Sequence, residues 1–334
     1  MMSMDFDHIA FLVPGNYAEE DPFTGLEATL RLFELGERLG YDSGWVRQRH
    51  LERGISSAAT FLAAASQRTR SIGLGTAVIQ LGYEHPFRLA EDLATVDVLS
   101  RGRLNVGVSV GYPSFAALIG GYPAEGDYGH TRAEALARLI ASPPLSPERV
   151  AGNASGAQVP RLQPVARELS ERLWYGGGSQ RSAVWAGGAG FHLLTGNIVS
   201  GEGTDDFLTA QRRLIDAFRR AGGGRVGLGR VILPTDSADF ATRRRYVDFA
   251  RSRHARTVEP QGARRTLFLP DIVGTVEEIA ALLSRDPVAA TARELRLELP
   301  YEFAVEDYEQ ILTDMARLLP EWRSADQTTQ KEAV

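Results

Sequence analysis

The sequence predicts an α/β fold, a (β/α)₈ TIM barrel with insertions after the fourth and the seventh strand. Two observations favour this class. Strand-like and helix-like segments alternate with short connections along most of the chain, as expected for a parallel sheet covered by helices. A count of about eight strand–helix units fits a closed barrel better than an open doubly wound sheet, which typically needs fewer.

The first half of the chain begins with a strongly apolar strand at residues 6–13, which ends at Pro14-Gly15. A helical repeat from Leu26 to Leu39 follows, and Gly40 is suited to its C-cap. The second strand, within 41–50, carries polar residues at its carboxyl end. The other elements expected here are strands at 72–79 and 103–109 and helices at 58–67 and 87–99.

The second half continues the alternation and holds both insertions. Residues 142–170, rich in Pro, Ala, Ser and Gly, and residues 255–276 do not fit it, and a helix at 276–285 is attached to the second insertion. We expect the segments 112–170 and 255–276 to shape a substrate pocket. The predicted strands are 171–176, 191–195, 226–233 and 293–299, and the predicted helices are 179–188, 204–221, 239–253 and 305–319. One domain is expected over 1–323, with a disordered polar tail at 324–334.

Composition excludes several function classes. The chain has 334 residues, 43% of them hydrophobic, and a net charge of -5 without a basic stripe, so we expect no nucleic-acid or membrane partner. It contains no cysteine, which excludes disulfides and thiolate nucleophiles and fits a cytoplasmic protein. No grouping of His, Asp and Glu has the spacing of a metal site, so no bound metal is expected.

From Trp174 to Gly190 the sequence indicates a strand that runs through a glycine-rich turn directly into a helix. Gly177 and Gly178 allow a ligand to approach the backbone, and Ser179 and Ser182 place hydroxyls beside the free N–H groups of the first helical turn. This pattern is typical of a phosphate site. The alternative is that Ser179 caps the helix and the glycines turn the chain.

Four phrases, in this order and spacing, resemble the bacterial luciferase-like flavin monooxygenases. They are Gly40-Tyr-Asp-Ser-Gly-Trp-Val46, Leu74-Gly-Thr-Ala-Val-Ile79, His85-Pro-Phe-Arg-Leu-Ala-Glu-Asp92 and Leu99-Ser-Arg-Gly-Arg-Leu-Asn-Val-Gly107. The resemblance implies a TIM barrel, usually dimeric, that binds FMN or the deazaflavin F420 at the carboxyl ends of its strands. The helix at 87–99 is the expected dimer contact.

The resemblance also implies a set of cofactor-binding residues. Ala77 and Val78 fall where many members keep a non-proline cis peptide under the flavin ring, although they are equally compatible with simple packing inside the barrel. Gly111 and Tyr112 match positions that line the flavin and its phosphate. Gly178, Ser179 and Ser182 match phosphate contacts, which gives the glycine-rich turn a ligand. His192 and Asn197 flank a strand near the outer face of the ring.

Two departures from the family pattern stand out. The luciferases carry Glu-His-His after the second strand, whereas this chain has Gln48-Arg49-His50, so Arg49 takes the place of the histidine that assists the chemistry. Arginine stays protonated and cannot act as a base, but it can hold an anion. His50 is the second catalytic candidate. Val110 stands where the family arginine reaches the flavin phosphate.

The expected function is an oxidoreductase, a monooxygenase that takes reduced FMN from a separate reductase and uses O₂ to oxidise a small organic substrate. Three alternatives stay open. They are hydride transfer with F420, flavin binding without turnover, and a barrel that binds a phosphorylated metabolite but no flavin.

Overall fold

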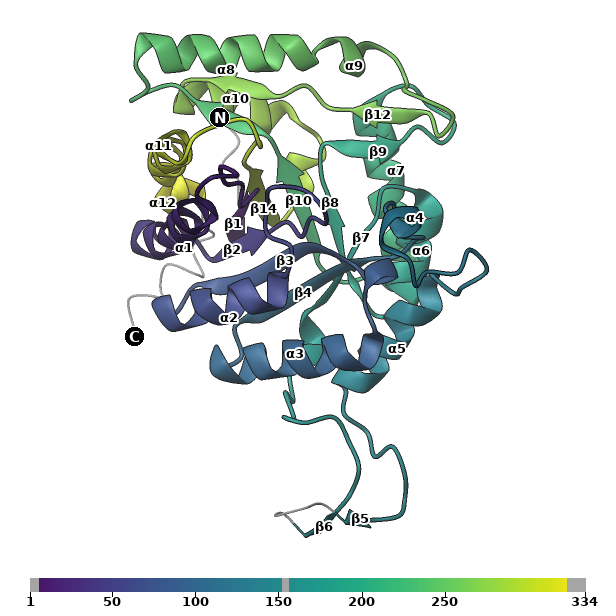
Figure 1. Ribbon diagram of the computed structural model, residues 1–334. Coiled ribbons are helices and arrows are strands. Elements are labelled where there is room, and N and C mark those ends of the chain that lie inside the picture. The colour runs from purple at the N-terminus through teal and green to yellow at the C-terminus, as the bar shows by residue number, and fades with distance from the viewer. Residues whose placement is uncertain (1–5, 152–155, 323–334) are drawn as a thin grey trace.

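The computed structural model describes residues 6–151 and 156–322, so the tail expected at 324–334 lies outside the described residues. Within these residues, eight parallel strands close into a barrel in the order β1-β14-β10-β8-β7-β4-β3-β2, which confirms the predicted fold class (Figure 1). The strands are β1 (His8–Val13), β2 (Ser43–Val46), β3 (Gly73–Gln80), β4 (Leu104–Ser109), β7 (Leu173–Gly176), β8 (His192–Thr195), β10 (Val226–Arg230) and β14 (Glu294–Glu298).

Helices cover the outside of the barrel. In the first of them, α1, the Asp21 side chain accepts a hydrogen bond from the Thr24 amide, Pro22 opens the helix, and Gly40 ends it in the left-handed conformation. The helices that follow barrel strands are α1 (Pro22–Leu39), α2 (Ala58–Arg68), α3 (Pro86–Leu99), α5 (His130–Ile140), α6 (Gln180–Gly188), α7 (Phe207–Arg220), α10 (Val276–Arg285) and α11 (Val305–Ala316). The short helices include α4 (Ala116–Ile119) and α12 (Leu319–Trp322).

The structure differs from the predicted helices at two places. Helix α5 was not expected, although Ala133, Leu136 and Ile140 form a buried stripe at helical spacing. The seventh barrel helix is α10 rather than α8 (Phe240–Arg253), which lies outside α10 in Figure 1. Helix α10 buries three residues, whereas α8 buries only Tyr246 because most of its surface is arginine and other polar residues.

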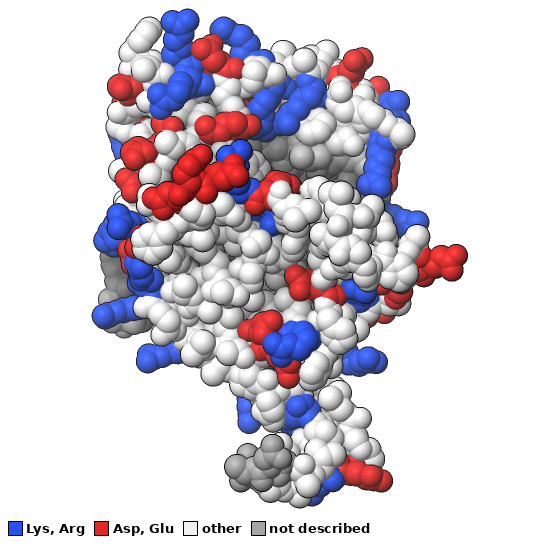
Figure 2. Space-filling view, viewed as in Figure 1, with Lys and Arg blue, Asp and Glu red and all other residues white. Residues whose placement is uncertain are grey.

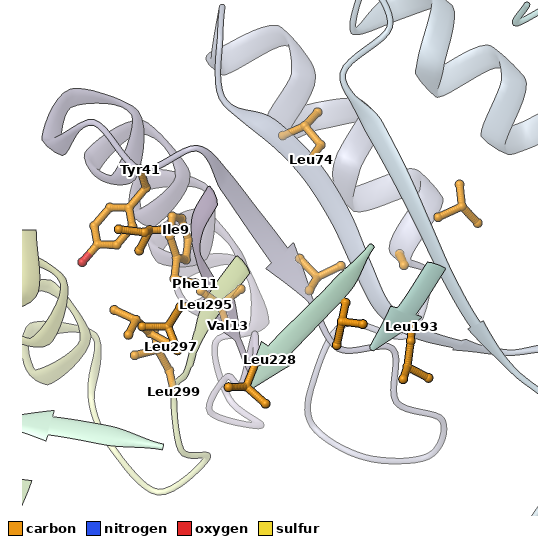
Figure 3. Close-up of a cluster of buried hydrophobic side chains, with 14 of the residues drawn as sticks. Ile9, Phe11, Val13, Tyr41, Leu74, Leu193, Leu228, Leu295, Leu297 and Leu299 are labelled. Atoms are coloured by element: carbon orange, nitrogen blue, oxygen red, sulfur yellow. The ribbon is translucent and has the colours of Figure 1, made fainter. Parts of the chain in front are cut away.

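Side chains of the strands alternate between the helices and the interior of the barrel. Ile9, Phe11 and Val13 of β1 belong to the large core under the helices, together with Leu295 and Leu297 of β14 (Figure 3). A second, smaller cluster fills the barrel lumen and contains Ala10, Leu12, Trp45, Trp174 and Leu194, with Ala77 and Val78 packed against it. The interior of the barrel is therefore a packed core. We call the carboxyl end of its strands the mouth.

The two insertions lie at different ends of the barrel. After α5, the chain forms the hairpin β5 (Val150–Ala151) and β6 (Ala157–Gln158), which projects away from α8 and α9 (Ala255–Val258) in Figure 1. The second insertion builds a layer over the mouth, in which β12 (Thr266–Phe268) pairs with β9 (Ile198–Ser200), and β13 (Ile272–Gly274) pairs with β11 (Ile232–Pro234). The expectation that the whole of 112–170 shapes the pocket is therefore wrong for its hairpin, which follows a helix and so lies at the amino end of the barrel.

Candidate active site

Three charged side chains meet inside the mouth. Glu298, at the end of β14, lies 3.5 Å from Arg47 Nη2 through Oε2 and 3.3 Å from Arg296 Nη2 through Oε1. Arg296 is only 5% exposed, and its Nε has no hydrogen-bond partner. Burial lowers the pKa of Arg296, and the Glu298 carboxylate acts against that shift. The cluster thus sets fixed charges directly above the apolar lumen.

This cluster was not predicted from the sequence, although a signal was present. Arg296 and Glu298 alternate with leucines on a strand that is otherwise fully buried, and charged residues are rare at such positions. Glycines make room for the carboxylate, because a Cβ at Gly196 or Gly229 would overlap with the Glu298 side chain.

Arg49 lies at the rim of the mouth. Its Nε donates a 2.8 Å hydrogen bond to Tyr301 Oη and lies 3.9 Å from Glu52 Oε2. The guanidinium groups of Arg47 and Arg49 both lie over the Tyr301 ring, 4.8 and 5.2 Å from its centroid. Tyr301 therefore orients both arginines, and Arg49 keeps its terminal nitrogens available to hold an anion.

His50 is held beside the mouth by polar and aromatic neighbours. Its ring lies 4.0 Å from the Tyr83 ring, and its Nε2 lies 3.2 Å from Gln48 Nε2. Because an amide nitrogen can only donate, His50 Nε2 is the acceptor. The same amide donates to Glu84 Oε1 at 2.9 Å. Burial lowers the pKa of His50 more than Glu84 raises it, so the imidazole is favoured in its neutral form.

Ala77 and Val78 lie together at the top of the lumen cluster, and the peptide bond between them is cis, as the resemblance led us to expect. Gly111, which follows β4, has a φ of 141° and donates its N–H to Tyr128 O at 2.8 Å. Tyr112 is half exposed, and its hydroxyl donates to Tyr122 O at 3.2 Å. These four residues are thus brought to the same end of the barrel.

A cavity of about 470 Å³ opens beside the first turn of α6, and we call it the α6 cavity. It is lined by Gly178, Ser179, Ile198, Val199, Ser200, Arg264 and Thr266. Gly177 and Ser182 are not among its lining residues. Ser179 and Ser182 form a capping box, in which Ser179 Oγ accepts from Ser182 N at 3.2 Å and Ser182 Oγ lies 3.3 Å from Ser179 N. Helix capping by Ser179 and an anion site at Gly178 and Ser179 are therefore both compatible with this turn.

Two charged residues escaped the sequence analysis, Arg264 in the lining of this cavity and Glu202 at the start of α6. Arg264, from the second insertion, places a positive charge at this cavity, whereas Val110 carries none. Its only signal in the sequence is the Arg264-Arg265 pair that follows Gly262. Glu202 carries the opposite, negative charge, and its Oε2 accepts a 2.8 Å hydrogen bond from Gln180 N at the start of α6. A carboxylate thus already occupies one of the free N–H groups of this helix.

Asn197 is the most unusual polar residue at the mouth. It follows β8, is only 4% exposed, and neither its Oδ1 nor its Nδ2 has a hydrogen-bond partner. Its backbone carbonyl accepts a 3.0 Å hydrogen bond from Leu269 N of the second insertion. A buried amide without partners costs stability, which is typical of a group kept for a ligand.

His8 and His192 lie at the opposite, amino end of the barrel. His8 Nε2 lies 2.7 Å from Ser43 Oγ, and His192 Nε2 lies 3.0 Å from Glu171 O. The expectation that His192 lies near a ring at the mouth is wrong, because it begins β8 whereas Asn197 follows that strand.

Across residues 6–151 and 156–322, no group of three or more His, Cys, Asp or Glu is arranged to hold a metal ion. No helix in the described part of the chain has the length and apolar character needed to cross a membrane.

The chain is similar to known monooxygenases. The family model for luciferase-like monooxygenases matches residues 4–302. The chain is 40% identical over 119 residues to 4-hydroxyprotoasukamycin monooxygenase of Streptomyces nodosus subsp. asukaensis, covering 35% of this chain and 32% of that protein. It is 39% identical over 116 residues to limonene 1,2-monooxygenase of Rhodococcus erythropolis, covering 33% and 30% of the two chains. The matched segments therefore span about a third of these relatives.

Solved structures agree over nearly the whole fold. A monooxygenase from Streptomyces bottropensis superimposes with a TM-score of 0.70 at 21% identity, covering 94% of this chain and 99% of the other. The oxygenating constituent of 3,6-diketocamphane monooxygenase from Pseudomonas putida, solved in complex with FMN, gives a TM-score of 0.66 at 16% identity and covers 95% and 97%. At these identities the likeness establishes the barrel fold.

Proposed function

Because the chain belongs to the luciferase-like monooxygenase family, we propose that it is a flavin-dependent monooxygenase that uses reduced FMN and O₂ to oxidise a small organic substrate. We further propose that the reduced flavin comes from a separate reductase and that the enzyme works as a cytoplasmic homodimer. Hydride transfer with F420 is the competing cofactor assignment.

The orphaned amide of Asn197 carries this proposal. The polar edge of a flavin ring offers both N–H and carbonyl groups, and an asparagine amide offers the matching acceptor and donor. The residues that follow Asn197, Ile198 to Ser200, line the α6 cavity, where Gly178, Ser179 and Arg264 can hold a phosphate. One short segment thus connects a site for the ring with a site for the phosphate.

The remaining residues have supporting roles in the proposal. Ala77 and Val78 give the ring an apolar base, and Gly111 and Tyr112 border it. Arg47 and Arg296 add donors at the mouth, where they are held by Glu298. A bound reduced flavin supplies the electrons with which O₂ is activated. Arg49, oriented by Tyr301, holds an anion at the rim. Neutral His50 can take up a proton there at Nε2 once this atom gives up the hydrogen bond from the Gln48 amide.

A spectroscopic titration tests the proposal. The purified protein is titrated with FMN and, separately, with F420, and the same titrations are repeated with Asn197→Ala. We expect the parent to bind FMN and the variant to bind it at least about tenfold more weakly, because two hydrogen bonds to the ring are lost.

Thermal unfolding of the flavin-free proteins is the control. The Asn197 amide has no partner within the protein, so its removal is expected to leave the melting temperature unchanged or to raise it. Equal FMN affinity of parent and variant would contradict the role of Asn197. If the parent binds F420 but not FMN, F420 replaces FMN as the assigned cofactor. If it binds neither, the proposal of a flavin-dependent enzyme is overturned.

A further inference from the structure

A second cavity lies under the junction of α8 and α9, and we call it the arginine cavity. Its volume is about 470 Å³, and it is lined by Ala250, Arg251, Arg253, His254, Ala255, Arg256, Thr257, Leu269, Pro270 and Asp271. Figure 2 shows the molecule hollowed between the layer of α8 and α9 and the barrel below it, with Lys and Arg side chains along the upper edge of the hollow.

Backbone hydrogen bonds fix this cavity over the mouth. Leu269 N donates to Asn197 O at 3.0 Å, and Ile272 N donates to Val231 O at 3.0 Å. Asn197 follows β8 and Val231 follows β10, so the lining segment 269–271 lies directly on the carboxyl ends of two neighbouring barrel strands. A ligand in the arginine cavity therefore lies near Asn197, the residue proposed to hold the flavin ring.

The charges in the cavity do not balance. Asp271 has a side chain only 1% exposed, and its Oδ2 lies 3.0 Å from Arg253 Nε. Arg256 forms no ion pair with any carboxylate of the described residues, and its guanidinium lies 4.6 Å from the centre of the Phe268 ring. The carboxylates of Asp271 and of the exposed Glu302 act on Arg256 only at longer range. Two guanidinium groups thus share one buried carboxylate, that of Asp271.

The hydrogen-bonding capacity is also unfilled. Arg253 Nε, Arg256 Nε and both carboxylate oxygens of Asp271 are buried without a well-formed hydrogen bond. Burial lowers the pKa of Arg256, and burial raises the pKa of Asp271 although both arginines act against it. An anion placed between the arginines would compensate their desolvation with charge-assisted hydrogen bonds.

We propose that the arginine cavity binds the carboxylate of an organic acid through Arg256 and Arg253, with the apolar part of that acid against Ala250, Leu269 and Pro270. We assign this acid as the substrate of the enzyme, and that assignment rests on the proposed monooxygenase function; the binding site itself does not. Arginine is suited to the task because its planar fork matches a carboxylate in two parallel hydrogen bonds.

Calorimetric titration of the flavin-free protein with benzoate tests the site, and benzamide is the uncharged control ligand. We expect benzoate to bind at millimolar concentration and benzamide to bind far more weakly. Arg256→Gln should weaken benzoate binding at least about tenfold, because a charged donor is lost. Arg244→Gln is the matched control, since Arg244 is an exposed arginine of the same layer and faces Asp248.

Asp271→Asn provides an effect of the opposite sign. The variant removes the carboxylate that competes for Arg253, so benzoate should bind at least about threefold more tightly than to the parent. No benzoate binding by the parent, equal binding of benzamide, or an unchanged affinity in both Arg256→Gln and Asp271→Asn would overturn the proposal.

An FMN titration of the same proteins keeps the two proposals apart. If benzoate binds with the expected pattern while neither FMN nor F420 binds, the flavin function fails and the carboxylate site stands. If FMN binds but benzoate does not, the carboxylate site fails and the flavin function stands.

Discussion

At the scale of single residues, the positive charge at the α6 cavity comes from an unexpected part of the chain. The family pattern places an arginine after the fourth strand, where this chain has Val110, and the structure instead brings Arg264 of the second insertion to the cavity. Sequence position could not reveal this substitution, because Arg264 and Gly178 are distant in the chain and meet only through the pairing of β12 with β9.

Arg264 is therefore expected to bind the flavin phosphate. Arg264→Gln should weaken FMN binding about tenfold or more, since hydrogen bonds between charged groups are worth about 1.5–3 kcal/mol. Arg265→Gln is the matched control, because the neighbouring Arg265 pairs with Asp205. Glu202→Gln should instead tighten FMN binding, as it removes a negative charge from the start of α6. Fluorescence titrations measure the FMN affinity of the three variants. If Arg264→Gln binds FMN as tightly as Arg265→Gln, Arg264 does not belong to the phosphate site.

At the scale of elements, the strands were the most predictable part of the fold. Each barrel strand lies within or one residue beyond its predicted segment, because strands buried on both faces are recognisable as short apolar runs. Helix α5 was missed since its stripe of Ala133, Leu136 and Ile140 is short and lies beside loop-like sequence. The roles of α8 and α10 were exchanged, although the arginine-rich sequence of α8 and the apolar stripe of α10 could have indicated which helix covers the barrel.

Adjacent leucines of α10 test its assignment as the seventh barrel helix. Leu283 is fully buried, whereas Leu282 is 47% exposed. Leu283→Ala should lower the free energy of unfolding by about 2–5 kcal/mol through the cavity it leaves. Leu282→Ala should change it by no more than about 0.5 kcal/mol. Urea denaturation measures both, and equal effects of the two substitutions would show that α10 packs only loosely on the barrel.

The candidate site was predictable only in part. The glycine-rich turn and the cis bond between Ala77 and Val78 were anticipated, since both lie on contiguous motifs. The Arg47–Glu298–Arg296 cluster and the arginine cavity were not, because each joins residues that are remote in sequence and that only barrel closure and the second insertion bring together.

At the scale of the whole molecule, helix α3 offers an apolar surface for the predicted homodimer. Helix α3 ends in Val98 and Leu99, which are 49% and 50% exposed although both are large and apolar. Burial of such side chains is a major source of association energy. The surface lies on the outside of the barrel and leaves the mouth open.

Light scattering tests this dimer across the micromolar range. The parent is expected to show twice the mass of one 36.5 kDa chain, and the double variant Val98→Asp, Leu99→Asp should shift the equilibrium towards one chain. Val247→Asp on α8 is the control, since Val247 is similarly exposed on another face of the molecule. A parent that scatters as a single chain would count against the dimer.

The six residues from Thr266 to Asp271 serve both cavities at the mouth. Thr266 lines the α6 cavity, and Leu269 to Asp271 line the arginine cavity. A ligand that moves this segment on binding at one cavity changes the shape of the other. Thermodynamic linkage then requires symmetry: the factor by which a carboxylate changes the affinity for FMN equals the factor by which FMN changes the affinity for the carboxylate. One coupling free energy would thus determine both how strongly the substrate favours cofactor binding and how strongly the cofactor favours substrate binding.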